Sequence, residues 1–278
     1  MSARESIVVV KLGGELLLPS ASPELDPIAR SLAQLVQGGV RLVVVHGGGP
    51  QTSDLMRRLG QEPVLEQGRR VTDADALWSM IRAVRGEVNV RLTGRLLREG
   101  LRTVGLDGLA GQCISCVKEA PQPSSTAPGA LLDYGYVGEI TRVDADFIRM
   151  FLTRQMVPVI ACLGVDESGH PLNVNADTVA RGVASALSAK QLVFVTGAPG
   201  VLRDRNEPDT RIPRLQASEA QEAIGSGIIA GGMIPKVREA FAAFAGGVKE
   251  VHVLGQLGAG DLERALRQPG SLGTVLEP

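Results

Sequence analysis

Two lysines and one aspartate carry the charges in this chain that are best placed to act on an anion. Lys11 lies near the end of an apolar run, Lys236 follows a glycine pair at the start of an expected helix, and Asp177 stands in the segment LNVNADTVA. A lysine at such a helix start suits an anion site, because backbone N–H groups, the helix dipole and a movable cation meet there. These groups favour phosphoryl transfer, in which positioning and charge neutralisation provide most of the rate.

Glycine-rich segments follow three of the apolar runs. They are Gly13-Gly14, Gly47-Gly48-Gly49 and Gly197-Ala198-Pro199-Gly200. Glycine lets a ligand approach the backbone closely, and several glycines in a row destabilise the chain unless something binds against them. The structural alternative is a loop that needs several positive φ angles. We interpret these segments as candidate phosphate-binding loops.

Polar side chains near these loops extend the candidate site. Asn173, Asn175 and Asp177 are spaced by two, which in an extended segment places them on one face. The alternative for Asp177 is an ordinary helix N-cap. Arg70 is a candidate clamp for a carboxylate or phosphate, because a guanidinium can bind an oxyanion in bidentate fashion; the alternative is a solvated surface arginine. His46, beside the triple glycine, is expected to be structural.

Strands and helices alternate along the chain and must position these groups. Continuous runs rich in valine and leucine are typical of strands buried on both faces of a parallel sheet. They occupy residues 6–12, 41–45, 102–105, 157–161, 191–196 and 250–254, with residues 273–275 as a short edge strand. Apolar residues at helical spacing fill the intervals, as at Leu25, Ile28, Leu32 and Leu35. This alternation predicts an α/β fold with a mainly parallel sheet covered by helices on both faces.

Residues 110–145 break the alternation. Cys113–Glu119 and Val137–Val143 read as the arms of a β-hairpin that could serve as a lid, joined by a segment rich in Pro, Ser and Ala. The Cys-x-x-Cys pair in its first arm lacks the second ligand pair that a structural zinc site needs. We therefore expect no metal site, and interpret Cys113, Cys116 and Cys162 as packing residues.

The candidate groups are expected to meet at one rim of the sheet. Ligands of open parallel sheets bind beyond the carboxyl ends of the strands. Lys11, Gly47–Gly49, Asn173 and Thr196–Gly200 lie at or just after such ends. The chain has only three histidines and no Gly-x-Ser-x-Gly segment, which argues against a hydrolase. It also lacks the P-loop and dinucleotide fingerprints.

Composition narrows the class of protein. The chain has 278 residues, is 44% hydrophobic and has a net charge of −1, as expected of a globular protein of one large domain or two lobes. A balanced charge argues against nucleic acid or an anionic membrane as the main partner. No apolar run is long enough for a membrane span or a signal peptide, so we expect a cytoplasmic protein.

Eight segments together resemble a known family. VVVKLGGELL, VVVHGGGPQ, GRRVTDADAL, GLDG, GYVGEI, LNVNADTVA, VFVTGAPGVL and GGMIPKVREA occur in this order and cover most of the chain. They closely resemble the motif series of the N-acetylglutamate kinases, a branch of the amino acid kinase family. The resemblance implies a three-layer αβα sandwich of two lobes. Residues 1–190 would bind acetylglutamate and form a homodimer, and residues 191–278 would bind ATP.

The implied reaction is the ATP-dependent phosphorylation of the γ-carboxylate of N-acetyl-L-glutamate in arginine biosynthesis. By resemblance, Lys11 and Lys236 reach the transferred phosphoryl group from opposite lobes and Asp177 holds both lysines. The implied acetylglutamate contacts are Gly47, Gly48, Arg70 and Asn173, with Arg70 on the α-carboxylate. The implied nucleotide contacts are Gly13, Gly14, Gly197, Ala198, Pro199, Gly200, Val201, Leu202, Ile228, Ile229 and Ala230. Mg²⁺ would be held mainly through the nucleotide phosphates.

The sequence also departs from the family pattern. Gly197 replaces the acidic residue usual in the turn after the strand, which puts nucleotide affinity or preference in doubt. The C-terminal HVLGQLGAGDLERAL lacks the pattern of arginine-inhibited members, and the N-terminus lacks the helix that builds their hexamer. We therefore predict a homodimer insensitive to arginine. Two alternatives stay open: a kinase of this scaffold acting on aspartate, carbamate or carrier-linked aminoadipate, and a catalytically silent amino-acid or nucleotide sensor.

Overall fold

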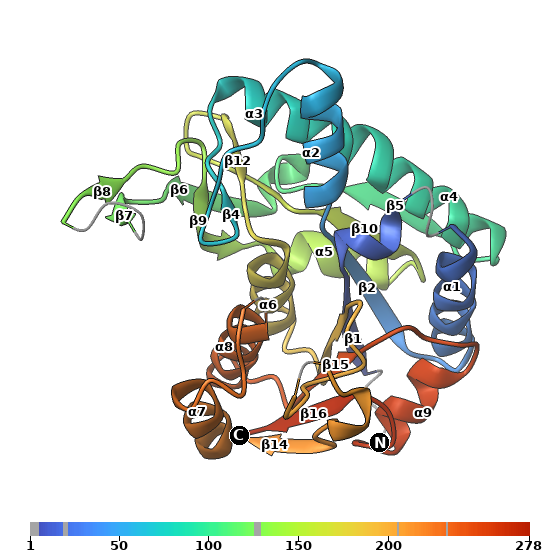
Figure 1. The fold of residues 1–278 in the computed structure, drawn as a ribbon. Coiled ribbons are helices and arrows are strands. Elements are labelled where there is room, and N and C mark those ends of the chain that lie inside the picture. Colours follow the sequence, from blue (N-terminus) through green and yellow to red (C-terminus); the bar gives the residue numbers. More distant parts are fainter. Residues whose placement is uncertain (1–5, 19–21, 125–128, 205, 232) are drawn as a thin grey trace.

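A central sheet runs through the molecule in the computed structural model, which describes residues 6–18, 22–124, 129–204, 206–231 and 233–278 (Figure 1). Within these residues the sheet has eight strands in the order β14-β16-β15-β13-β1-β2-β10-β5. The strands are β1 (Ile7–Leu12), β2 (Arg41–His46), β5 (Thr103–Leu106), β10 (Val157–Ala161), β13 (Gln191–Val195), β14 (Arg214–Gln216), β15 (Glu250–Leu254) and β16 (Thr274–Glu277). Every neighbouring pair is parallel except β15 and β16. The predicted mainly parallel sheet is confirmed.

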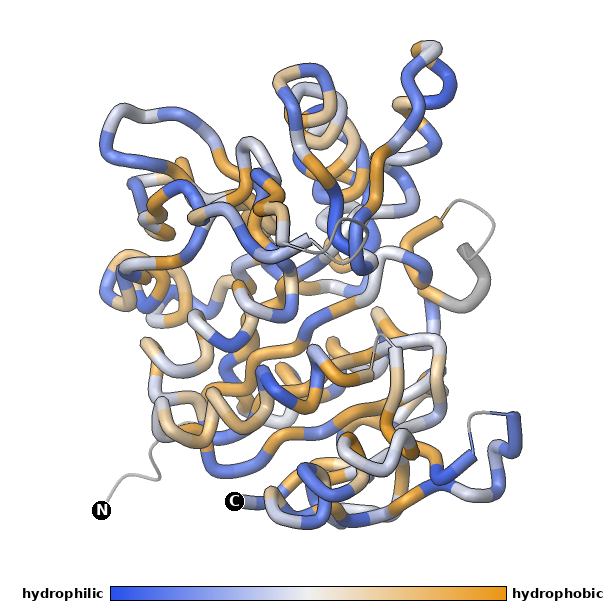
Figure 2. Tube along the Cα trace, turned by 60° about the vertical axis from the view of Figure 1, so that its left-hand side comes forward, coloured by the Kyte–Doolittle hydropathy of each residue, from blue (hydrophilic) through white to orange (hydrophobic). Residues whose placement is uncertain are grey.

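Helices cover both faces of this sheet. Alternate residues of β1 point to opposite faces, so Val8 and Val10 belong to one buried core and Val9 to the other. The first core is covered by α1 (Ser22–Gln37), α4 (Asn89–Arg98) and α9 (Asp261–Arg267), and the second by α5 (Ala145–Leu152), α6 (Ala176–Ala186), α7 (Ala217–Gly225) and α8 (Met233–Ala245). Figure 2 accordingly shows hydrophobic segments of the chain running through the middle of the molecule. This is the three-layer αβα arrangement that the resemblance implied.

The predicted hairpin is present and belongs to a second sheet. β6 (Ile114–Lys118) pairs antiparallel with β9 (Gly138–Val143), and β11 (Leu163–Val165) and β12 (Pro171–Asn173) complete this four-stranded sheet. A short pair, β7 (Gln122–Pro123) and β8 (Leu131–Leu132), continues the hairpin away from the body of the molecule (Figure 1). Residues 125–128 of the expected connection lie outside the described residues. Two-residue strands β3 (Leu65–Glu66) and β4 (Arg69–Arg70) form another hairpin nearby.

The helical region after β4 packs on the triple glycine. It consists of α3 (Ala74–Met80), a π-helical segment (Ile81–Val88) and α4, and it lies against α2 (Gly49–Arg58). Val84 of the π-helical segment comes so close to Gly48 that a Cβ there would be 2.7 Å from the Val84 methyl carbon. Packing against Val84 therefore favours glycine at position 48, independently of any ligand.

Two details differ from expectation. The last strand, β16, is not at the edge of the sheet, because β14 pairs outside it. β14 escaped prediction since only Leu215 is buried, between exposed Arg214 and Gln216. No helix of the described residues is both long and apolar enough to cross a membrane.

The expected boundary between residues 190 and 191 falls just before β13. This strand pairs with β1 on one side and β15 on the other, so one sheet continues across the two proposed lobes. Lys11 on β1 and the turn after β13 consequently lie at neighbouring strand ends.

Candidate active site

Three charged side chains predicted from the sequence meet in the structure. Lys11 Nζ lies 2.8 Å from Asp177 Oδ1, and Lys236 Nζ donates to Asp177 Oδ2 at 3.2 Å. Their side chains are 8%, 17% and 7% exposed for Lys11, Lys236 and Asp177. β1 supplies Lys11, the first turn of α6 supplies Asp177 and the first turn of α8 supplies Lys236. Two ammonium groups thus share one carboxylate and leave an excess of one positive charge.

Asp177 is ionised at neutral pH. Burial by itself raises the pKa of Asp177, but the charges of Lys11 and Lys236 outweigh burial and hold this pKa below the ordinary aspartate value. A carboxylate whose pKa lies below the ordinary aspartate value is a poor proton acceptor near pH 7. Its chemistry here is to fix and partly neutralise the two lysines.

Asn175, and not Asp177, caps helix α6. The Asn175 side-chain oxygen accepts a hydrogen bond from the Asp177 backbone N–H at 2.8 Å. The N-cap interpretation of Asp177 is therefore wrong, and its carboxylate stays available to the lysines. Its place in the first turn also puts the negative charge at the positive end of the helix dipole.

A first cavity of about 280 Å³ opens beside these charges. All four predicted acetylglutamate contacts line it together with Lys11 and Asp177: Gly47, Gly48, Arg70 and Asn173. Asn173 donates to the Thr72 hydroxyl at 2.9 Å, which fixes its amide. The volume suits a small molecule, and the lining combines cations, backbone amides and apolar side chains.

Arg70 brings a buried positive charge to the first cavity. Its Nη2 donates to Gly49 O at 3.1 Å and to Ser53 Oγ at 2.7 Å, and Nη1 contacts Met56 Sδ at 3.1 Å. None of these partners is acidic. Burial, and next the charge of Arg57, lowers the pKa of Arg70, so this guanidinium is destabilised until an anion joins it. Arg70 is therefore suited to bind a carboxylate.

The glycine loops are held to each other by a residue that sequence reasoning missed. Gln51, almost fully buried, donates from Nε2 to Gly14 O at 2.8 Å. Gly47 N–H donates to Leu12 O at 3.1 Å. These bonds fix the loops after β1 and β2 side by side.

His46 is structural, as expected. Its Nδ1 lies 2.9 Å from Gly47 O and its Nε2 lies 2.9 Å from the Asn89 side-chain nitrogen. Because a carbonyl only accepts, these partners assign the proton to Nδ1 and leave Nε2 as acceptor. Complete burial lowers the pKa of His46 to about 4.

This neutral histidine predicts a loss of stability in acid. Between pH 6.5 and pH 4 the unfolded chain protonates His46 and the folded chain does not, so folding weakens as the pH falls. From pH 7 to pH 5 we expect this residue to cost about 2 kcal/mol of unfolding free energy. Urea unfolding at both pH values should show the loss in the wild type and a smaller loss in His46→Gln. The exposed His170 is the control, and an equal pH dependence in wild type and His46→Gln would contradict the assignment.

A second cavity of about 680 Å³ lies on the other side of the lysine pair. Seven of the predicted nucleotide contacts line it: Ala198, Gly200, Val201, Leu202, Ile228, Ile229 and Ala230. Lys236 also lines it and contacts Asp177, which lines the first cavity. The three charged groups therefore stand at the junction of two ligand-sized cavities.

Four other predicted nucleotide contacts do not line the second cavity. Gly197 and Pro199 line a third cavity of about 330 Å³, because alternate residues of the turn face opposite sides. Gly14 lines the first cavity. The Gly13 N–H donates a hydrogen bond to Val195 O at 3.0 Å. The Glu15 carboxylate lies directly over Gly13.

Glu15 was not identified from the sequence. Its Oε1 accepts a hydrogen bond from Gly197 N–H at 3.3 Å. The Glu15 carboxylate thus lies beside the turn in which Gly197 replaces the acidic residue of the family pattern. Glu15 comes from the short 3-10 helix Gly14–Leu17 that follows β1, and no sequence pattern connects residues so far apart.

Comparison with known proteins decides the family. The sequence profile of the amino acid kinase family matches residues 6–255. The chain belongs to the amino acid kinase family. An acetylglutamate kinase from Anaeromyxobacter dehalogenans (strain 2CP-1 / ATCC BAA-258) is 46% identical over 269 residues, which are 97% of this amino acid kinase and 98% of the relative. Another acetylglutamate kinase, from Sorangium cellulosum (strain So ce56), is 45% identical over 271 residues, 98% of this kinase and 94% of the relative.

Solved structures share the fold of this amino acid kinase. N-acetylglutamate synthase from Neisseria gonorrhoeae, complexed with coenzyme A and N-acetyl-glutamate, superposes with a TM-score of 0.81 at 27% identity. The match covers 98% of this kinase and 59% of the synthase. Carbamate kinase from Giardia has a TM-score of 0.70 at 15% identity and shows the fold alone, with 99% of each chain covered. The predicted family and fold are confirmed.

Proposed function

We propose that this amino acid kinase transfers the γ-phosphoryl group of ATP to the γ-carboxylate of N-acetyl-L-glutamate, forming an acyl phosphate in arginine biosynthesis. The observation that carries the proposal is the Lys11–Asp177–Lys236 group at the junction of the two cavities. The first cavity offers Arg70 to an anionic acceptor, and the second offers a large, partly apolar space to a nucleotide. The acetylglutamate kinases at 45–46% identity support this acceptor.

The reaction needs no general base. A carboxyl acceptor with a pKa near 4 is already ionised at pH 7. The difficulty is repulsion between the acceptor carboxylate and the phosphate chain. Lys11 and Lys236 offset that repulsion from opposite sides, and such charge clamps contribute several kcal/mol to barrier lowering. Asp177 orients the two lysines and takes no proton.

Mg²⁺ enters this proposal with the nucleotide substrate. The described residues contain no group of three or more His, Cys, Asp or Glu that could hold a metal ion, and Asp177 is engaged by two lysines. This donor set fits an ion bound mainly by the phosphate oxygens, where it neutralises further negative charge.

We assign the remaining roles by position. Arg70 binds the α-carboxylate of the acceptor, and Gly47, Gly48 and Asn173 complete its site in the lobe of residues 1–190. The lobe of residues 191–278 binds ATP through the turn after β13 and the segment Ile228–Ala230. An acceptor with one anionic group, such as carbamate, would leave Arg70 without an anionic partner, which favours an acceptor with two carboxylates.

A direct assay tests the proposed reaction. ATP turnover that depends on acetylglutamate should yield a hydroxamate in the presence of hydroxylamine, because hydroxylamine traps the acyl phosphate. Aspartate and carbamate, tested in parallel, should give far less product. Higher turnover with either of them, or ATP binding without any hydroxamate, would refute the proposal in favour of another kinase or of a silent sensor.

Replacing Arg70 should impair acceptor binding selectively. We expect Arg70→Gln to raise the KM for acetylglutamate about 100-fold, because the α-carboxylate loses a charged partner in a buried site. The KM for ATP should stay within about twofold, since Arg70 lies away from the second cavity. Steady-state kinetics with each substrate varied would measure this. Arg58→Gln, a change to an exposed arginine of α2 that lines neither cavity, is the control, and equal losses in the two variants would contradict the role of Arg70.

We also propose a cytoplasmic homodimer that arginine does not inhibit. Trp78, Val90 and Leu97 of the helical region 74–98 are more than half exposed, which supports an apolar contact surface in the first lobe. Sedimentation analysis should give twice the chain mass, and activity should be unchanged by arginine. A hexamer, or inhibition by arginine, would contradict this proposal.

A further inference from the structure

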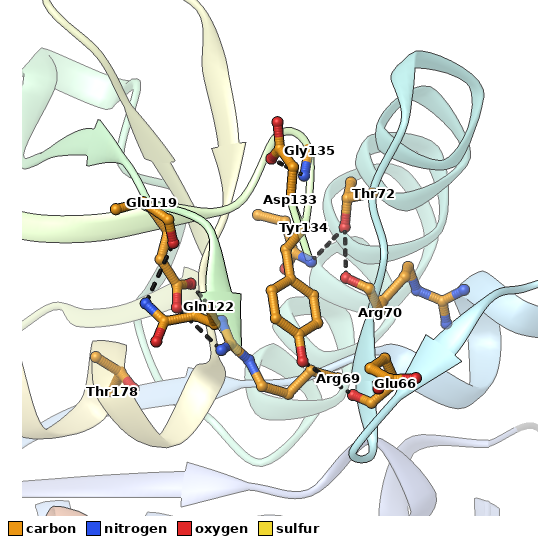
Figure 3. Close-up of polar contacts among 12 residues, drawn as sticks. Glu66, Arg69, Arg70, Thr72, Glu119, Gln122, Asp133, Tyr134, Gly135 and Thr178 are labelled. Carbon is orange, nitrogen blue, oxygen red and sulfur yellow. Dashed lines mark hydrogen bonds and ion pairs between the residues drawn. The ribbon is translucent and has the colours of Figure 1, made fainter. Parts of the chain in front are cut away.

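Two adjacent arginines of β4 line the first cavity with different partners. Arg70 contacts only uncharged groups, whereas Arg69 forms a bidentate pair with Glu119. Figure 3 shows the two guanidinium groups pointing away from each other, as expected of neighbours in a strand. The charge of Arg69 is therefore balanced, and that of Arg70 is not.

Arg69 is held in place from two directions. Its Nη1 donates to Glu119 Oε1 at 2.9 Å, and its Nη2 donates to Glu119 Oε2. Its Cζ lies 4.3 Å from the centre of the Tyr134 ring, so the guanidinium also stacks on an aromatic face (Figure 3). The buried Tyr134 is itself fixed, because its hydroxyl donates to Glu66 O at 3.3 Å. These contacts join the β3–β4 hairpin to the arm that follows β6.

A side cavity of about 420 Å³ adjoins the first cavity at Arg69. The two cavities share Arg69, Val137, Val174 and Asn175 in their linings. The charged residues of the side cavity are Arg69, Arg181, Glu119, Glu139 and Glu239, and Arg181 pairs with Glu239. Because Arg69 is paired with Glu119 and Arg181 with Glu239, the excess negative charge of the lining lies on the exposed Glu139. A group that extends past the two valines therefore meets no unpaired cation among these lining residues.

We propose that Glu119 is a specificity-determining residue for the acceptor. By pairing with Arg69, Glu119 leaves Arg70 to recognise one carboxylate and makes the side cavity reject an N-acyl group that carries its own negative charge. The inference rests on the proposed function, because it concerns the acyl group of that acceptor. An acetyl group is neutral and short, so it passes this selection. A succinyl group ends in a carboxylate, for which Arg69 is unavailable because Glu119 already neutralises it.

The test compares N-acetyl-L-glutamate with N-succinyl-L-glutamate as acceptors. The measured quantity is the ratio of their kcat/KM values, succinyl over acetyl. Glu119→Gln frees the charge of Arg69, so we expect the ratio to rise about tenfold. Arg69→Gln leaves the Glu119 charge unpaired, so the ratio should fall by a similar factor. Both variants break the same contact, so a purely structural role would change the ratio in the same direction in each. Opposite changes in the ratio therefore identify an effect of charge.

Two further variants control the test. Glu139→Gln removes a negative charge from the same cavity without freeing Arg69, and because Glu139 is exposed and its charge is screened by water, it should change the ratio much less. The double variant Glu119→Gln/Arg69→Gln should bring the ratio back toward the wild-type value. An unchanged ratio in Glu119→Gln, or shifts in the same direction in both single variants, would overturn the inference. Acetylglutamate turnover by the wild type tests the proposed function separately.

Discussion

Replacing Lys11 with methionine should lower kcat by about 1,000-fold, the largest effect we expect from any single substitution. Methionine fills much of the lysine volume but brings no charge to the acceptor carboxylate and the transferred phosphoryl group. The loss should appear in kcat at saturating acetylglutamate and ATP, because neutralisation matters most where charge is concentrated in the transition state. Neither KM should change more than about fivefold.

Lys118→Met is the matched control for this substitution. Lys118 is also a strand residue paired with an aspartate, Asp133, but this pair is half exposed and lines neither the first nor the second cavity. Its kcat should equal that of the wild type. If Lys11→Met instead kept its kcat and only raised the KM for acetylglutamate, Lys11 would be a ground-state binding residue and our account of its role would be wrong.

Asp177→Asn should lower kcat by about 100-fold and change the KM for acetylglutamate by less than about threefold. Asparagine keeps the shape of the side chain but no longer neutralises two buried ammonium groups. Lys11 and Lys236 would then repel each other and leave their positions. Asp146→Asn, a change to a highly exposed aspartate in the first turn of α5, should have no effect on either constant.

The pH dependence of the Asp177 variant separates an organiser from a base. The pKa of Asp177 lies below the ordinary aspartate value, so the wild type should show no fall in kcat between about pH 8 and pH 6 from protonation of this group. Asp177→Asn should give a profile of the same shape at a lower level. A wild-type acidic limb that disappears in Asp177→Asn would show that Asp177 accepts a proton, contrary to the organiser role.

The sequence predicted the position of a strand well where that strand is buried on both faces of the sheet. β10 and β15 match their expected residues because nearly all of their side chains are buried. β14 could not be predicted, because three residues with a single buried leucine are too few to show the alternation of buried and exposed side chains that is typical of a strand. The cap of α6 was also ambiguous, because Asn175 and Asp177 are both good N-cap residues and only the backbone geometry distinguishes them.

The sequence predicted the residues of the candidate site better than the contacts between them. Lys11 and the glycine loops could be placed from strand ends alone, whereas the meeting of Lys236 with Asp177 depended on a family resemblance. The pairing of Arg69 with Glu119 joins residues 50 positions apart, and no periodic pattern indicates it. The same holds for Gln51 on Gly14 and Glu15 on Gly197, because side chains that join loops follow the tertiary fold.

The central claim is that Lys11 and Lys236, oriented by one carboxylate, converge on the transferred phosphoryl group from opposite lobes. The most direct measurement is a crystal structure with MgADP, tetrafluoroaluminate and N-acetyl-L-glutamate, in which the fluoroaluminate stands in for that group. We predict both lysine Nζ atoms within about 3 Å of its fluorine atoms, with Asp177 still between the two lysines. A complex in which either ammonium group lies beyond hydrogen-bond reach of the fluoroaluminate, with the acceptor correctly bound, would contradict the account.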